Sequence, residues 1–129
     1  MYAEAFVRGM EQVDHGTLAV IGSVAGDRGR KSNYVYGAAK GLVERYAQGL
    51  QHRLAKTRVK VVLIKPGPTQ TPMTVAMGAA YARMARVEDV AGTIVAGIAA
   101  GKPVVYAPGK WAVIMLVIRN LPCLSLIHI

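Results

Sequence analysis

One short segment, with a different kind of structure on each side, places the tightest constraint on this fold. Residues 17–21 form an apolar run that predicts a buried β-strand, and residues 34–55 have the apolar spacing of a long α-helix. Between them, residues 22–33 are rich in glycine and charged side chains, which indicates a loop. The chain is therefore expected to pass from a strand through a loop directly into a helix.

Three polar side chains between residues 22 and 40 are placed to carry chemistry. Ser23 follows the strand, and Tyr36 and Lys40 lie in the first turns of the helix, four residues apart and thus on one face. A nearby ammonium stabilises a phenolate, so Tyr36 is expected to act as a general acid or base near neutral pH. The Ser23 hydroxyl could then orient a substrate oxygen. Tyr34 lacks this arrangement, because Ala38 stands four residues after it.

The pattern of Ser23, twelve intervening residues and then Tyr36-Gly-Ala-Ala-Lys40 resembles the active site of the short-chain dehydrogenase/reductase family. The resemblance implies an α/β fold with a Rossmann-like, doubly wound parallel sheet. It implies that Tyr36 is the acid/base, that Lys40 assists it and holds the nicotinamide ribose, and that Ser23 orients the substrate oxygen. NAD or NADP is the implied cofactor, and an alcohol or ketone the implied substrate.

A second strand and its exit loop contribute to the same expected site. Residues 59–64 are rich in β-branched side chains and predict a buried parallel strand, and the proline-rich residues 66–74 predict a loop after it. Ligands of open α/β sheets bind beyond the carboxyl ends of the strands. By resemblance, the cofactor-binding residues of this loop are Pro66, Gly67, Thr69 and Thr71. An ordinary strand-exit loop is the alternative.

The remaining elements complete an expected set of three strands and about four helices. Residues 2–13 and 86–100 have helical apolar spacing, and residues 103–106 predict a short last strand. Residues 72–84 are apolar, rich in methionine and only partly helical in spacing. The resemblance suggests a lid over the substrate there, while methionines that fill a core are the alternative.

The resemblance covers about the second half of a short-chain dehydrogenase/reductase. No glycine-rich pyrophosphate turn occurs in the sequence, so residues 1–110 are expected to be the C-terminal half of the catalytic domain. Such a chain is expected to bind NAD(P) weakly and to self-associate. Residues 111–123 predict an apolar tail, and residues 124–129 resemble a translated sequencing adapter and are expected to be non-native.

Composition limits which partners and ligands the chain is expected to bind. The formal charge of +9 comes from basic residues that are scattered and complete no nucleic-acid-binding motif, so nucleic acid is not an expected partner. One cysteine excludes an internal disulfide framework, and no metal site is expected. By resemblance, helices 2–13 and 34–55 form a homo-oligomer, although core packing explains the same apolar stripe on the longer helix. The stripe comprises Val35, Ala39, Leu42, Val43, Tyr46, Leu50 and Leu54.

Two alternatives to a cytoplasmic dehydrogenase remain open at this point. The chain could be a non-catalytic dimerisation or binding module of the same fold. It could also belong to a membrane-associated reductase of a lipid-linked substrate, with peripheral membrane contact through residues 111–123. That tail is shorter than the roughly 20 apolar residues that a spanning helix needs.

Overall fold

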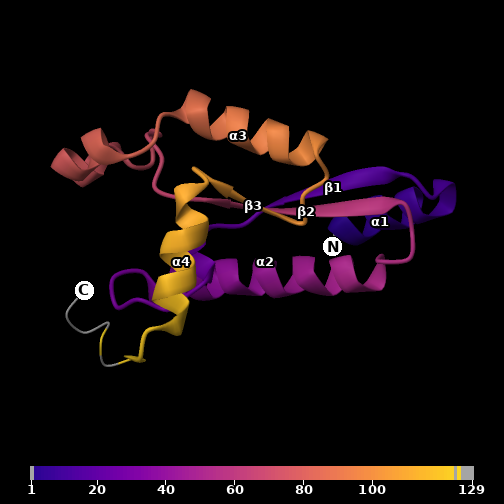
Figure 1. The fold of residues 1–129 in the computed structure, drawn as a ribbon, viewed down its shortest axis with the longest axis horizontal. Coiled ribbons are helices and arrows are strands. Elements are labelled where there is room, and N and C mark those ends of the chain that lie inside the picture. Colours follow the sequence, from indigo (N-terminus) through magenta and orange to yellow (C-terminus); the bar gives the residue numbers. More distant parts are fainter. Residues whose placement is uncertain (1, 124, 126–129) are drawn as a thin grey trace.

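A computed structural model describes residues 2–123 and 125, and the adapter-like residues 124 and 126–129 lie outside it. A three-stranded parallel sheet with helices on both faces forms its centre (Figure 1). The elements are α1 (Tyr2–Val13), β1 (Gly16–Ile21), α2 (Tyr34–Arg53), β2 (Val59–Pro66), α3 (Val87–Ala99), β3 (Val104–Ala107) and α4 (Lys110–Asn120). The predicted α/β class with a partial Rossmann-like sheet is confirmed.

The central strand β2 separates two cores. Its alternate side chains Val59, Val61 and Leu63 face α1 and α2, where they pack with Val7 and Leu50. The intervening side chains of β2 face α3 and pack with its apolar residues and with Val105 of β3. Because successive residues of a strand point to opposite faces, a run of apolar residues covered on both faces is what a central parallel strand requires.

β1 lies at one edge of the sheet and pairs with β2 alone, in parallel register from Gly16 opposite Val59 to Ile21 opposite Ile64. Leu18 and Val20 pack onto the core beneath α1 and α2. On the other face Ile21 is 62% exposed. The prediction that residues 17–21 form a buried strand is therefore wrong for one face of β1, because α3 packs over β2 and β3.

The apolar stripe predicted on α2 enters the core only in its second half. Leu50 and Leu54 are buried, but Val35 and Leu42 are 71% and 70% exposed. In the first half of the helix, the side that faces the protein carries Gly37 and then Glu44. Core packing is therefore the wrong explanation for the first half of the stripe.

The boundaries of β2 and β3 also differ from prediction. β2 continues through Pro66, which pairs in register with Ala107 of β3. A proline is tolerated at this last position because the next residue, Gly67, donates the hydrogen bond to the Ala107 carbonyl. β3 begins at Val104 rather than Pro103, whose carbonyl nevertheless accepts a hydrogen bond from Leu63.

The methionine-rich segment after β2 forms short 3₁₀ turns over Val75–Arg83, interrupted at Gly78 with a φ of 58°. No residue of these turns is buried, and Met73 and Met77 are 86% and 57% exposed. The interpretation of these methionines as core filling is therefore wrong.

The segment predicted as an apolar tail forms helix α4, which stands against the end of the sheet (Figure 1). Met115, in the middle of α4, is buried. Near the C-terminal end of the helix, the Arg119 carbonyl accepts a hydrogen bond at 3.1 Å from Arg28, which lies in the loop after β1. Within residues 2–123 and 125, no helix is both long enough and apolar enough to cross a membrane.

Candidate active site

The first wall of the site is the loop that leaves β1. Gly22 continues the sheet by donating to the Ile64 carbonyl at 2.7 Å. Ser23 then caps a 3₁₀ turn over Val24–Gly26, with its Oγ accepting a hydrogen bond from the Ala25 N–H at 3.1 Å. Because the serine oxygen serves as the acceptor, its own hydroxyl hydrogen remains available to a substrate oxygen.

Two glycines let this loop pack directly on the first turns of α2. A Cβ at Gly26 would lie 2.9 Å from the Lys40 carbonyl carbon, and a Cβ at Gly37 would lie 2.9 Å from the Ala25 carbonyl oxygen. A side chain at either position would push the loop away from the helix. The two glycines therefore hold the Ser23 loop against the turns that carry Tyr36 and Lys40.

The predicted Tyr36–Lys40 pair is present at the start of α2. The Lys40 Nζ lies 5.8 Å from the centre of the Tyr36 ring and donates a hydrogen bond to the Ile21 carbonyl at 3.3 Å. This anchors the ammonium above the carboxyl end of β1. Tyr36 is 48% exposed, so its ring is open to a ligand.

The loop after β2 is held by the hydroxyl of Thr74, a residue that sequence reasoning missed. Its Oγ1 lies 2.7 Å from the Thr69 carbonyl oxygen and accepts from the Thr71 N–H at 2.9 Å. The Thr69 hydroxyl donates back to the Gly67 carbonyl at 2.9 Å. Threonines at short spacing after a proline-glycine pair are a signal for such a turn. The loop path is therefore fixed by its own side chains.

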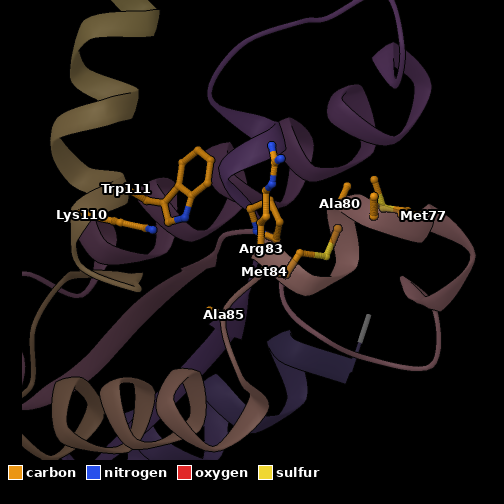
Figure 2. Close-up of a pocket in the computed structure, with 9 residues that line it drawn as sticks. Met77, Ala80, Arg83, Met84, Ala85, Lys110 and Trp111 are labelled. Carbon is orange, nitrogen blue, oxygen red and sulfur yellow. The ribbon is translucent and has the colours of Figure 1, made fainter.

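Trp111, at the start of α4, covers this loop. A Cβ at Gly67 would meet the indole Nε1 at 2.2 Å, so only glycine permits the contact. Trp111 also helps to enclose a pocket of about 410 Å³ between α4 and the methionine-rich segment (Figure 2). The pocket is lined by Pro68, Met77, Ala79, Ala80, Arg83, Met84, Ala85, Lys110 and Trp111. No sequence pattern indicated that α4 would reach this loop.

A buried ionic cluster lies behind the site. The Lys65 Nζ is 2.6 Å from Asp27 Oδ1 and 2.7 Å from Glu44 Oε1, and the Tyr106 hydroxyl donates to Asp27 Oδ2 at 2.7 Å. The Lys65 side chain is only 3% exposed. The cluster joins the Ser23 loop, α2, β2 and β3, so it ties both elements that carry the predicted catalytic residues to the sheet.

Opposing effects act on the pKa of Lys65. Burial lowers this pKa, but the hydrogen bonds and charges of Asp27 and Glu44 outweigh burial, so the pKa is raised overall. The pKa of the Tyr106 hydroxyl is raised, first by burial and then by its hydrogen bond to Asp27. Lys65 is therefore held in its charged form and Tyr106 in its neutral form.

Comparison with known protein sequences indicates the family of this chain. A family model described as short chain dehydrogenase matches residues 1–82. An uncharacterized oxidoreductase of Streptomyces coelicolor is 34% identical over 114 residues, which cover 88% of this chain and 44% of that protein. The chain thus spans less than half the length of this relative.

Solved structures show the same fold. A short-chain dehydrogenase from Sphingobium yanoikuyae in complex with NADPH superposes with a TM-score of 0.75 at 21% identity, covering 94% of this chain and 52% of that one. A short chain dehydrogenase from Burkholderia cenocepacia in complex with NADP gives a TM-score of 0.78 at 21% identity, covering 91% and 49%. The sequence match and the shared fold together show that this chain belongs to the short-chain dehydrogenase family.

Proposed function

We propose that this chain carries the acid–base centre of an NAD(P)-dependent enzyme that interconverts an alcohol and a ketone. One observation carries the proposal: Lys40 holds its ammonium beside the exposed Tyr36 ring, above the carboxyl end of β1 and next to the Ser23 loop. This is the edge of a parallel α/β sheet where ligands bind.

The three side chains have separable roles in the proposed reaction. In the oxidation direction, the Tyr36 oxygen takes the hydroxyl proton of the alcohol, and the Lys40 ammonium stabilises the phenolate form that accepts this proton. The Ser23 hydroxyl donates a hydrogen bond to the substrate oxygen and keeps it facing Tyr36. In the reduction direction, Tyr36 returns the proton to the oxygen.

The residues present fit a nicotinamide dinucleotide. Lys40 uses one hydrogen bond to the Ile21 carbonyl, which leaves ammonium N–H groups for ribose hydroxyls. Pro66 ends β2, the strand beside β1, and the fixed loop with Gly67, Thr69 and Thr71 follows it. Structural neighbours bound to NADPH and NADP support this cofactor class, either NAD or NADP. The cofactor would supply or accept the hydride.

The proposed enzyme is a homo-oligomer through α1 and α2. Val35 and Leu42 are exposed on α2, and Phe6 is 63% exposed on α1. The two helices lie side by side, because Glu4 of α1 accepts hydrogen bonds from Tyr46 and Arg53 of α2. Their exposed apolar side chains support a contact with a second copy.

Replacing Tyr36 by phenylalanine tests the proposal. Tyr36→Phe removes only the hydroxyl, and it is expected to lower kcat by about 10²–10⁴-fold, the usual contribution of general acid–base catalysis. The assay uses a chimera in which this chain replaces the matching segment of the Streptomyces coelicolor relative, with hydride transfer followed by nicotinamide absorbance.

Tyr34→Phe is the matched control, because Tyr34 is also exposed, at 67%, but has no lysine one turn later. It is expected to keep most of the activity. Equal losses in the two variants would contradict the role given to Tyr36.

A further inference from the structure

We infer that the pocket between the methionine-rich segment and α4 binds a small molecule with an apolar body and an anionic group, a phosphate or a carboxylate. The inference rests on the proposed function, because this molecule would be the substrate whose alcohol or ketone carbon reacts.

The walls of the pocket account for the apolar body. Met77 and Met84 come from one side and Trp111 from the other (Figure 2). The other apolar lining residues are Pro68, Ala79, Ala80 and Ala85. Flexible methionines and a flat indole suit an apolar ligand of irregular shape. The volume, about 410 Å³, lies in the range of small-molecule pockets.

Two cations account for the anionic group. Arg83 and Lys110 line the pocket from opposite sides, and no aspartate or glutamate is among its lining residues (Figure 2). In the described part of the chain, neither cation has a carboxylate within salt-bridge distance. Hydrogen bonds from such cations to an anionic oxygen are stronger than those between neutral groups.

The pocket also adjoins the predicted cofactor loop. Pro68 of this loop lines the pocket, and Trp111, which also lines it, packs directly on Gly67. The facing turns over Val75–Arg83 bury no residue, and Met77 is 57% exposed. A bound apolar body would cover these side chains and remove their surface from water.

Trp111 provides a direct test, because it is the single tryptophan of the chain and lines the pocket. Its fluorescence is followed while the chain is titrated separately with n-octyl phosphate, n-octyl glucoside or inorganic phosphate. Both octyl compounds are kept monomeric. Octyl phosphate is expected to bind at least about tenfold more tightly than either of the others, and to weaken as salt is added.

Charge variants locate the anionic group. Arg83→Gln with Lys110→Gln is expected to weaken octyl phosphate binding about tenfold and to leave octyl glucoside binding unchanged. Arg8→Gln with Lys56→Gln is the matched control, since it removes the same charge from exposed residues outside the pocket and is expected to change neither titration. Equal weakening of octyl phosphate in both double variants would overturn the inference.

Ala80→Phe locates the apolar body. Ala80 is exposed and lines the pocket, so a phenyl ring there is expected to fill space without disturbing the core and to weaken both octyl ligands. Unchanged binding of both would place the ligands elsewhere and overturn the inference. So would a fluorescence response to phosphatidylglycerol vesicles with none to monomeric octyl phosphate, because the ligand would then be a membrane surface.

These outcomes are separate from those that test the proposed function. The titrations need no cofactor and no turnover, and Tyr36 does not line the pocket. If octyl phosphate fails to bind while Tyr36→Phe still abolishes turnover, the substrate class is wrong and the acid–base assignment stands. If octyl phosphate binds as expected but Tyr36→Phe leaves turnover intact, the proposed chemistry is wrong.

Discussion

Two lysines of this protein show how the same side chain serves opposite purposes. Lys65 is 3% exposed and lies within 2.7 Å of two carboxylates. Lys40, only partly buried, has one hydrogen bond to a backbone carbonyl at 3.3 Å and a tyrosine ring at 5.8 Å. The ammonium of Lys65 is neutralised by two buried carboxylates and supports the fold. Among the described residues, the ammonium of Lys40 has no such partner, and it stays accessible for the proposed reaction.

The difference in burial and contacts separates the structural role of Lys65 from the proposed chemical role of Lys40. A buried ammonium surrounded by carboxylates is costly to disturb, because removing it leaves their negative charges unpaired in the interior. An ammonium at the rim of the sheet contributes little to stability, since water replaces its contacts. Substitution of Lys65 should therefore lower stability strongly. Substitution of Lys40 should have little effect on stability but a large effect on the proposed activity.

The largest effect on stability is expected from Lys65→Met. Methionine keeps most of the side-chain volume but leaves Asp27 and Glu44 buried without their cation, at a cost of about 3–5 kcal/mol in the free energy of unfolding. Urea denaturation measures this loss. Lys56→Met, at an exposed position, is the control and should change stability by less than about 0.5 kcal/mol. A small loss at Lys65 would mean that the cluster does not stabilise the fold.

Alkaline pH should weaken the same cluster. The pKa values of Lys65 and Tyr106 are both raised in the folded state, above ordinary values of 10.5 and 10.0. Their contribution to stability is therefore complete below these ordinary values and is lost as pH rises through the higher folded-state values. Unfolding free energy measured from pH 8 upward should fall above about pH 10, and less steeply in Lys65→Met. A parallel fall in both proteins would contradict this explanation.

A smaller effect is expected where the Ser23 loop touches α2. Gly37→Ala places a methyl group 2.9 Å from the Ala25 carbonyl oxygen, which should cost about 1–3 kcal/mol and shift the loop. Gly49→Ala lies in the same helix with no atom within 4 Å of the added group, so it should stabilise by up to about 1 kcal/mol. Denaturation of both variants gives the comparison, and changes of the same sign would show that the close contact is unimportant.

The smallest effect on stability is expected from Lys40→Met, less than about 1 kcal/mol. Its effect on the proposed reaction should be large, because the ammonium beside the Tyr36 ring is lost. The oxidation rate of the chimera should fall. An unchanged rate, with the chemical step rate-limiting, would give Lys40 another role.

The sequence predicted those features that depend on neighbours along the chain. Tyr36 and Lys40 are one helical turn apart, and residues 59–64 form a β-branched run, so local spacing was enough to place them. The family and the fold class followed from these features and are confirmed by comparison. The catalytic and cofactor roles of individual residues remain predictions.

Features that depend on distant segments were not predictable in this way. Lys65 stands at the end of an apolar strand, and only the fold shows that Asp27, Glu44 and Tyr106 surround it. Trp111 looked like the start of an apolar tail because its partner, Gly67, is 44 residues earlier in the sequence. The exposed half of the α2 stripe was ambiguous, since periodicity shows which residues share a face but not what covers it.

The Lys65 cluster also limits the order in which contacts of this protein can form during its synthesis on the ribosome. Its Tyr106–Asp27 hydrogen bond joins residues 79 positions apart, so the bond cannot form until β3 has been synthesised. Until then, the loop that carries Ser23 lacks this one link to β3. Non-local contacts of this kind slow folding. A nascent chain halted before residue 104 would thus contain Ser23, Tyr36 and Lys40 but lack the hydrogen bond that joins the Ser23 loop to β3.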